Sequence, residues 1–180
     1  VMMGTLEQAG WEITNNASEA DTVVVNTCGF IESAKQESID AILEATGLKA
    51  EGKAKRVVVA GCLVERYRDD LMKELPEVDA FIGTNEVTRI LEAADETNKF
   101  RELPLLPIGN KTATYLYDCD TPRHRATDSH TAFIKIAEGC DRPCAFCSIP
   151  SMRGSFRSRR FGSIIEEARN LAKQGVKELV

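Results

Sequence analysis

Two short apolar runs rich in β-branched residues, 22–25 and 57–60, most constrain the fold of this 180-residue chain. Such runs are typical of strands that are buried on both faces of a parallel sheet. The predicted strands and helices alternate along the chain as 21–26, 32–45, 56–60, 64–75, 78–82 and 86–94. This alternation predicts an α/β fold, with an open parallel sheet between two layers of helices and right-handed crossovers.

Glycines are expected to set the ends of the first helices. A helical stripe over 1–9 precedes Gly10, which is a plausible stop. The helix over 32–45 is predicted to end through Gly47 and Gly52, because glycine readily leaves helical geometry.

The pattern changes after residue 99. Residues 100–131 hold three prolines and no sustained period, which is typical of a connector; a short strand is considered over 114–117. A strand over 131–137, a helix over 163–174 capped by Ser163, and a strand over 176–180 then follow. The predicted domains are an amino-terminal α/β domain over 1–99, a connector over 100–131, and the start of a second α/β domain over 132–180.

The composition excludes several classes of protein. No run approaches the roughly 18 apolar residues of a membrane helix, and the net charge of −5 argues against a nucleic-acid-binding surface. Six cysteines without a secretory signal favour a reducing compartment, so we expect a cytoplasmic protein whose thiols are ligands or core residues. Both ends read as interrupted elements, and an internal piece of a longer protein is expected.

Three cysteines, Cys140, Cys144 and Cys147, lie on one short loop at spacings of four and three positions. Iron–sulfur clusters usually take four cysteine thiolates. Three thiolates would therefore leave one iron without a protein ligand, and an open position is typical of a metal site that performs chemistry.

Cys28 and Cys62 form a second candidate site. Each follows a predicted parallel strand, and ligands of open α/β sheets bind outside the carboxyl ends of the strands. Gly29 and Gly61 are expected to allow close approach of the backbone to a bulky inorganic group. The alternative is that both cysteines are small buried hydrophobic residues.

The pattern Cys-x-x-x-Cys-x-aromatic-Cys, with Phe146 as its aromatic residue, resembles the cluster loop of radical S-adenosylmethionine (SAM) enzymes. The resemblance implies that Cys140, Cys144 and Cys147 hold a 4Fe–4S cluster whose open iron binds SAM and whose reduction leads to SAM cleavage. It also implies that Phe146 lies near the adenine of SAM. The loop would follow the first strand of a (βα) barrel, at the face where barrel active sites lie.

Residues 26–31 and 60–67 resemble the amino-terminal domain of the methylthiotransferases, which precedes a radical SAM barrel. In that family three cysteines of this domain hold an auxiliary 4Fe–4S cluster. Cys28 and Cys62 match two of them, whereas the third lies upstream of the helix that begins here at Val1. The resemblance thus implies two 4Fe–4S clusters and SAM as cofactors, with one auxiliary ligand missing from this chain.

Residues 28–38 and 147–159 resemble the RimO-type branch of the family, which modifies an aspartate of a small-subunit ribosomal protein. The implied reaction replaces a C–H bond at the β-carbon of that aspartate by C–S–CH₃, with a ribosomal protein and an electron donor as partners. A second SAM would supply the methyl group. The other branch, which modifies an adenosine of transfer RNA, is the alternative, and we predict that this chain alone is inactive.

Two interpretations come from other classes of protein. One is an iron–sulfur electron-transfer module that never cleaves SAM. The other is a zinc-stabilised domain, for which the only histidines are His124 and His130.

A basic run follows the cysteine loop and contains Arg153, Arg157, Arg159 and Arg160. Its members are expected to form a solvated loop, or to contact the SAM carboxylate or the substrate, since arginine suits carboxylates. Cys119 matches no position of the family and is predicted to have no role.

Overall fold

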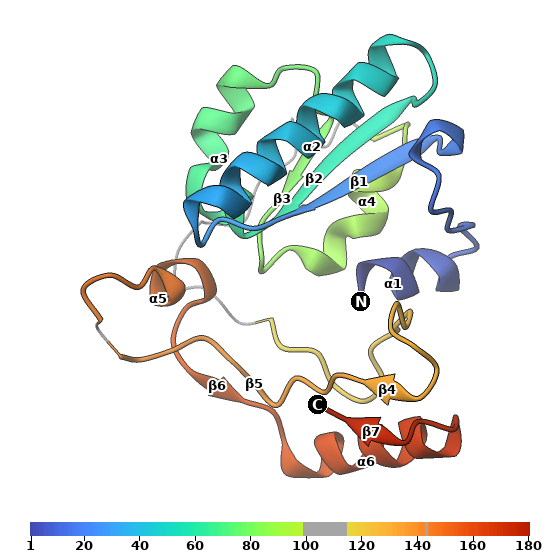
Figure 1. Ribbon diagram of the computed structural model, residues 1–180, viewed down its shortest axis with the longest axis vertical. Coiled ribbons are helices and arrows are strands. Elements are labelled where there is room, and N and C mark those ends of the chain that lie inside the picture. The colour runs from blue at the N-terminus through green and yellow to red at the C-terminus, as the bar shows by residue number, and fades with distance from the viewer. Residues whose placement is uncertain (99–114, 143) are drawn as a thin grey trace.

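The computed structural model describes residues 1–98, 115–142 and 144–180, and its elements form an α/β fold (Figure 1). The first part of the chain contains α1 (Met2–Gln8), the 3-10 turn η1 (Ala17–Glu19), β1 (Thr22–Thr27), α2 (Glu32–Ala50), β2 (Arg56–Gly61), α3 (Cys62–Glu74), β3 (Ala80–Ile82), the 3-10 turn η2 (Val87–Arg89) and α4 (Ile90–Ala94). The second part contains β4 (Thr131–Ala132), β5 (Ala137–Glu138), α5 (Ile149–Arg153), β6 (Arg157–Ser158), α6 (Phe161–Lys173) and β7 (Glu178–Leu179).

Strands β1, β2 and β3 form a parallel sheet in that order, as the apolar runs predict. The register of β1 and β2 runs from Thr22 opposite Arg56 to Thr27 opposite Gly61. The two strands therefore end level with each other. The chain leaves both strands at the same edge of the sheet, and this edge carries the candidate site of Cys28 and Cys62.

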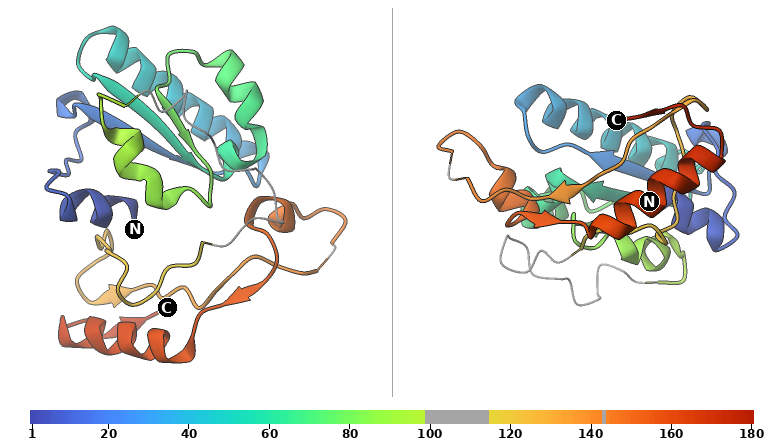
Figure 2. Two further views of the ribbon diagram at one scale, coloured as in Figure 1. Left: turned by 180° about the vertical axis from the view of Figure 1, so that it is seen from behind. Right: turned by 90° about the horizontal axis from the view of Figure 1, so that it is seen from below.

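Helices cover both faces of this sheet, which confirms the predicted three layers (Figures 1 and 2). On one face Val57 enters a core with Ile42 of α2, and on the other Val58 enters a core with Leu6 of α1 and Ile90 of α4. Both valines are fully buried. Burial of each contributes about 1.5–3 kcal/mol to the free energy of unfolding.

The second part of the chain begins another α/β arrangement. Strands β4 and β7 are parallel neighbours, and α6 precedes β7 and contributes Leu171 to a small core with Ala132 and Val176. Strands β5 and β6 form a separate antiparallel pair. The domain boundaries at 99 and 131 stay predictions. Residues 115–117 form no strand, and the rest of the strand considered over 114–117 lies outside the described residues.

Two helix boundaries were predicted wrongly. Helix α2 passes through Gly47 and ends at Ala50, where Lys49 anchors its last turn through an ion pair of 2.6 Å to Asp79. That anchor outweighs the cost of one helical glycine, which is about 1 kcal/mol. The predicted stop at Gly52 is confirmed, since Gly52 has a φ of +73° just past the helix. Helix α3 begins at Cys62 and not at residue 64, because Gly61 turns the chain directly from strand into helix.

The prediction of one strand over 131–137 is also wrong. Its two ends pair with different partners, β4 with β7 and β5 with β6, so the ladder is interrupted between them. Helix α6 begins at Phe161, and Ser163 does not cap it. The Ser163 hydroxyl instead accepts hydrogen bonds from the Cys119 amide at 2.9 Å and from Arg159 at 3.0 Å.

We predict that Gly61→Ala strongly destabilises the chain. Gly61 has a φ of +108°, and a Cβ atom there would lie 2.5 Å from the Thr27 carbonyl oxygen. The substitution combines backbone strain with a clash against backbone, so the free energy of unfolding should fall by about 2 kcal/mol or more. Urea denaturation followed by circular dichroism measures this change.

Gly47→Ala is the matched control. Gly47 lies inside α2 with open space around the position of its missing Cβ. Alanine there should raise the free energy of unfolding by about 0.5–1 kcal/mol. Equal destabilisation by the two substitutions would contradict the role given to Gly61.

Candidate metal centre at the cysteine loops

Cys28 and Cys62 emerge at the same edge of the sheet because β1 and β2 end level. Cys28 directly follows β1 and is exposed, whereas Cys62 is the first residue of α3 and only 8% exposed. The interpretation that their strands are neighbours is confirmed. One thiol therefore faces solvent and the other lies at the buried base of the same edge.

Local contacts fix the backbone around these two cysteines. The Cys28 amide donates to the Ser38 hydroxyl of α2 at 3.0 Å, and the Gly29 carbonyl accepts from Arg66 of α3 at 3.1 Å. A Cβ at Gly29 would lie 2.8 Å from the Cys62 carbonyl oxygen. Because Gly29 has no side chain, the segment after β1 can lie close to the start of α3, which directly follows β2. Close approach to an inorganic group, the other reason predicted for this glycine, stays a prediction.

The three-cysteine loop is anchored at its start. The Cys140 amide donates to the Gly154 carbonyl at 3.0 Å, and Gly139 has a φ of +77° where a Cβ would collide with the Ser155 backbone. Within the loop, the Cys147 amide donates to the Cys144 carbonyl at 3.2 Å. The loop is therefore tied to the segment that directly follows α5.

The exposure of the loop suits ligand binding. Cys144 is exposed, Cys140 and Cys147 are half-buried, and all three are free thiols. The Phe146 side chain is 91% exposed, so it is available for a contact with a ligand. Free, accessible thiols of this spacing are the donor type that iron–sulfur clusters take.

The described side chains do not converge on one metal position. Within residues 1–98, 115–142 and 144–180, no three His, Cys, Asp or Glu side chains meet closely enough to hold a metal ion. His124 contacts Glu7 of α1 at 2.8 Å, and His130 is exposed. The type and spacing of the donors therefore support a cluster, whereas the described geometry does not assemble one.

Arg153 links the two candidate sites. Its Nη2 donates to Cys62 Sγ at 3.3 Å, and its Nη1 lies 3.0 and 3.2 Å from the two carboxylate oxygens of Glu138. Glu138 ends β5, two residues before Cys140. The sequence analysis missed this bridge. The sequence did offer a signal: an acid, Glu138, lies just before the cysteine loop, and a base, Arg153, lies just after it.

Positive charge is in excess around this bridge. Lys135 and Arg153 both contact Glu138, so two cations share this carboxylate, and Arg157 lines the same small cavity. Burial, together with the charges of Arg153 and Arg157, lowers the pKa of Lys135 to about 8, while Cys62 acts in the opposite direction. The immediate surroundings of the bridge are thus electropositive.

The rest of the basic run is mostly structural. Arg159 is 6% exposed and forms an ion pair with Glu167 of α6, and its guanidinium lies 4.6 Å from the centre of the Tyr117 ring. Arg157 donates to the Arg153 and Ser155 carbonyls. Arg160 is exposed. The expectation of a solvated loop is therefore wrong for Arg159, because its charge is neutralised in the interior.

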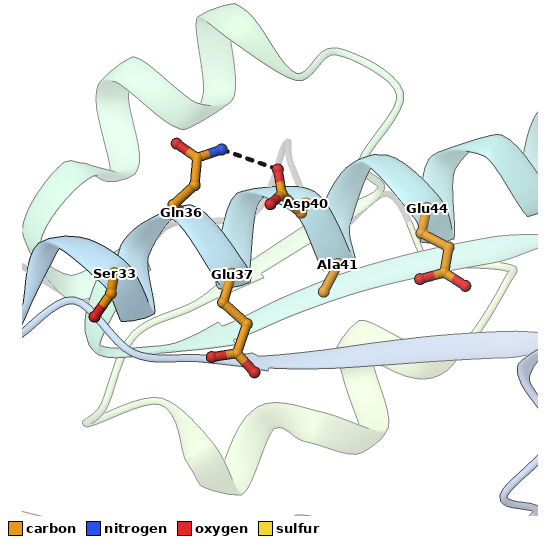
Figure 3. A pocket seen from close by; sticks show the side chains of 6 residues that line it. All are labelled: Ser33, Gln36, Glu37, Asp40, Ala41 and Glu44. Carbon is orange, nitrogen blue, oxygen red and sulfur yellow. Dashed lines mark hydrogen bonds between the residues drawn. The ribbon is translucent and has the colours of Figure 1, made fainter.

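A surface hollow lies along α2. It is lined by Ser33, Gln36, Glu37, Asp40, Ala41 and Glu44, and Gln36 donates to Asp40 (Figure 3). It offers carboxylates but no thiol. In the part of the chain that the structure describes, no helix combines the length and hydropathy needed to cross a membrane.

Comparisons with known proteins agree with the residues above. Residues 1–83 match the model of "Uncharacterized protein family UPF0004". The chain is 46% identical over 217 residues to the ribosomal protein uS12 methylthiotransferase RimO of Koribacter versatilis, covering 99% of this chain and 43% of that protein. The chain is 51% identical over 179 residues to the enzyme of the same name from Solibacter usitatus, covering 99% of this chain and 37% of that protein. It is 49% identical over 183 residues to the enzyme of the same name from Bdellovibrio bacteriovorus, covering 100% of this chain and 39% of that protein. The chain spans about two-fifths of the length of these curated relatives.

We predict that Lys135 reacts with amine reagents at lower pH than other lysines do. A pKa of about 8 leaves half of its amines neutral near pH 8, and the neutral amine is the nucleophile. Trace acetylation read by mass spectrometry across pH should give a midpoint near 8 for Lys135.

Lys55 is the matched control, because its hydrogen bond and charge contact with Asp21 raise its pKa. Arg157→Gln should move the Lys135 midpoint upward, since it removes a positive neighbour. A Lys135 midpoint equal to that of Lys55 would contradict the electropositive character of the site.

Proposed function

Because the chain belongs to the RimO-type methylthiotransferase family, we propose that it carries both cysteine sites of a radical SAM enzyme that methylthiolates an aspartate of a small-subunit ribosomal protein. The observation that carries the proposal is the Arg153 bridge, which joins Cys62 to the residue that flanks the three-cysteine loop. It supports a functional relation between two sites that are far apart in the sequence.

In this proposal Cys140, Cys144 and Cys147 hold a 4Fe–4S cluster through their thiolates. Such a cluster, when bound, supplies the electron that cleaves SAM at its open iron. The chain's own contribution is positioning: the Cys140 amide and Gly139 fix the start of the loop against Gly154. Phe146 is proposed to lie against the adenine of SAM, which its exposed ring supports.

Cys28 and Cys62 are proposed as two of the three ligands of an auxiliary 4Fe–4S cluster that delivers sulfur. Their level placement at one sheet edge supports a shared site. The hydrogen bond from the Arg153 guanidinium to Cys62 Sγ supports the proposal as well, since such donors are typical partners of sulfur ligands in clusters. We propose that this 180-residue chain alone does not complete the reaction.

The proposed partners follow from the proposed substrate. A C–H bond at the β-carbon of aspartate would be replaced by C–S–CH₃, with a second SAM as methyl donor and an external protein as electron donor. A cytoplasmic location is proposed, where ribosomal proteins are substrates. The relatives' names mention uS12, which favours this branch over methylthiolation of an adenosine in transfer RNA.

We predict that Cys144→Ala abolishes cluster binding at the loop. After anaerobic reconstitution, its iron should fall by about four per chain relative to the parent, because such clusters usually take four thiolates and only two would remain at the loop. SAM cleavage to deoxyadenosine by the full-length enzyme should be lost as well. Iron analysis and chromatography of the nucleoside product measure the two effects.

Cys119→Ala is the matched control. Cys119 is a half-buried thiol that contacts Glu166, outside both cysteine sites, so its loss should leave iron and SAM cleavage unchanged. Unchanged iron content and SAM cleavage in Cys144→Ala would contradict the proposal. If the parent binds zinc and no iron, a structural domain is favoured. If it binds iron but forms no deoxyadenosine, an electron-transfer module is favoured.

A substrate assay with the full-length enzyme tests the branch. We predict that the small-subunit ribosomal protein gains the mass of one methylthio group on an aspartate, as read by peptide mass spectrometry. Transfer RNA from the same reaction should gain none. Methylthiolated adenosine in the RNA, with unmodified protein, would support the alternative branch.

A further inference from the structure

We propose that Arg153 is a positioning residue that clamps Cys62 to the start of the three-cysteine loop, a role whose cluster part rests on the proposed function of Cys62. One guanidinium reaches both sides: Nη2 to Cys62 Sγ at 3.3 Å, and Nη1 to both carboxylate oxygens of Glu138 at 3.0 and 3.2 Å. Cys62 and Arg153 are 91 residues apart in the sequence. The planar fork of arginine suits such a bridge, whereas a lysine ammonium acts as a point charge.

The backbone of Arg153 is held on both sides, so the guanidinium is not a freely moving surface group. The carbonyl of Met152, which is 2% exposed, accepts from the Thr84 hydroxyl at 2.9 Å, just after β3. The carbonyl of Gly154 accepts from the Cys140 amide at 3.0 Å. Helix α5 also packs against α3, which begins at Cys62 (Figure 1). Arg153 is thus fixed to the sheet edge and to the cysteine loop together.

The surroundings strengthen the contact with sulfur. Cys62 is only 8% exposed, and a cavity of about 10 Å³ beside Arg153 has room for about one water molecule. Three groups that line this cavity, the Asn85 amide nitrogen, the Tyr115 hydroxyl and Arg157 Nε, are buried without a hydrogen-bond partner among the described residues. Polar contacts in such a confined site are stronger than in bulk water.

A cationic N–H donor on a ligand sulfur has two physical effects. It stabilises negative charge on that sulfur and fixes the direction of the side chain. For an iron–sulfur cluster, hydrogen bonds to the sulfurs and nearby positive charge also make reduction easier. Arg153 would therefore orient Cys62 and raise the reduction potential of the auxiliary cluster, while it keeps the two cysteine sites at a fixed separation.

A double-mutant cycle on the metal-free chain tests the clamp itself. The effect of Arg153→Gln on the unfolding equilibrium constant is measured with Cys62 present and in Cys62→Ala, by urea denaturation. We expect the effect to be about fivefold smaller in the Cys62→Ala background, because the hydrogen bond to sulfur is already gone. Arg160→Gln removes the same charge from an exposed position and should show no coupling to Cys62.

A redox titration tests the cluster part. In the full-length enzyme, Cys140, Cys144 and Cys147 are all replaced by alanine, so that only an auxiliary cluster can form. Followed by electron paramagnetic resonance, Arg153→Gln should shift the midpoint potential to a more negative value at unchanged iron content. Arg153→Lys should restore part of the shift, because it keeps the charge but not the fork, and Arg160→Gln should leave the potential unchanged.

The outcomes separate the clamp from the proposed cluster. Coupling to Cys62 together with the negative potential shift supports the inference. Absence of coupling, or an unchanged potential at full iron content, overturns it. If the parent binds no auxiliary cluster while Arg153 and Cys62 remain coupled, the proposed function of Cys62 fails and the clamp between the two parts of the chain is supported.

Discussion

The level register of β1 and β2 is the constraint on which the rest of the structure depends. Thr27 pairs with Gly61, and the Thr27 hydroxyl donates to the Ala60 carbonyl at 2.6 Å, so both strands stop at one height. A side chain at position 61 would separate the strand ends. Because the backbone can pass this closely, Cys28 and Cys62 leave the sheet together and α3 starts directly at the second thiol.

Polar contacts attach the second part of the chain to this edge. The Thr84 hydroxyl binds the Met152 carbonyl, and Arg153 reaches Cys62. Charged contacts gain little in bulk water but cost much when broken inside a protein, so they specify geometry more than they add stability. Contacts of this type favour one arrangement of the two parts of the chain. A fixed arrangement is needed if the two cysteine sites are to work together, as proposed.

The sequence predicted the parallel sheet and its helices because buried strands and amphipathic helices leave strong periodic patterns, as in 22–25 and 57–60. It failed where tertiary contacts outweigh local preference: Lys49 carries α2 past Gly47, and Ser163 binds Cys119 and Arg159 where a cap was predicted. The three loop cysteines were found from their spacing, and Cys28 and Cys62 from their places after two predicted strands. The charges of Glu138 and Arg153 flank the loop in the sequence, but no local pattern records that Arg153 reaches Cys62, 91 residues away.

The surroundings of Cys62 distinguish it from an inert core cysteine. An inert core cysteine lies among apolar groups, whereas a cysteine beside a guanidinium has a charged hydrogen-bond donor for its sulfur. Cys62 is buried, yet Arg153 faces its sulfur and the nearby charges are mostly positive. Packing of a small apolar residue would not require this donor on the sulfur, since Arg153 already pairs with Glu138. The contact therefore supports the ligand role proposed for Cys62.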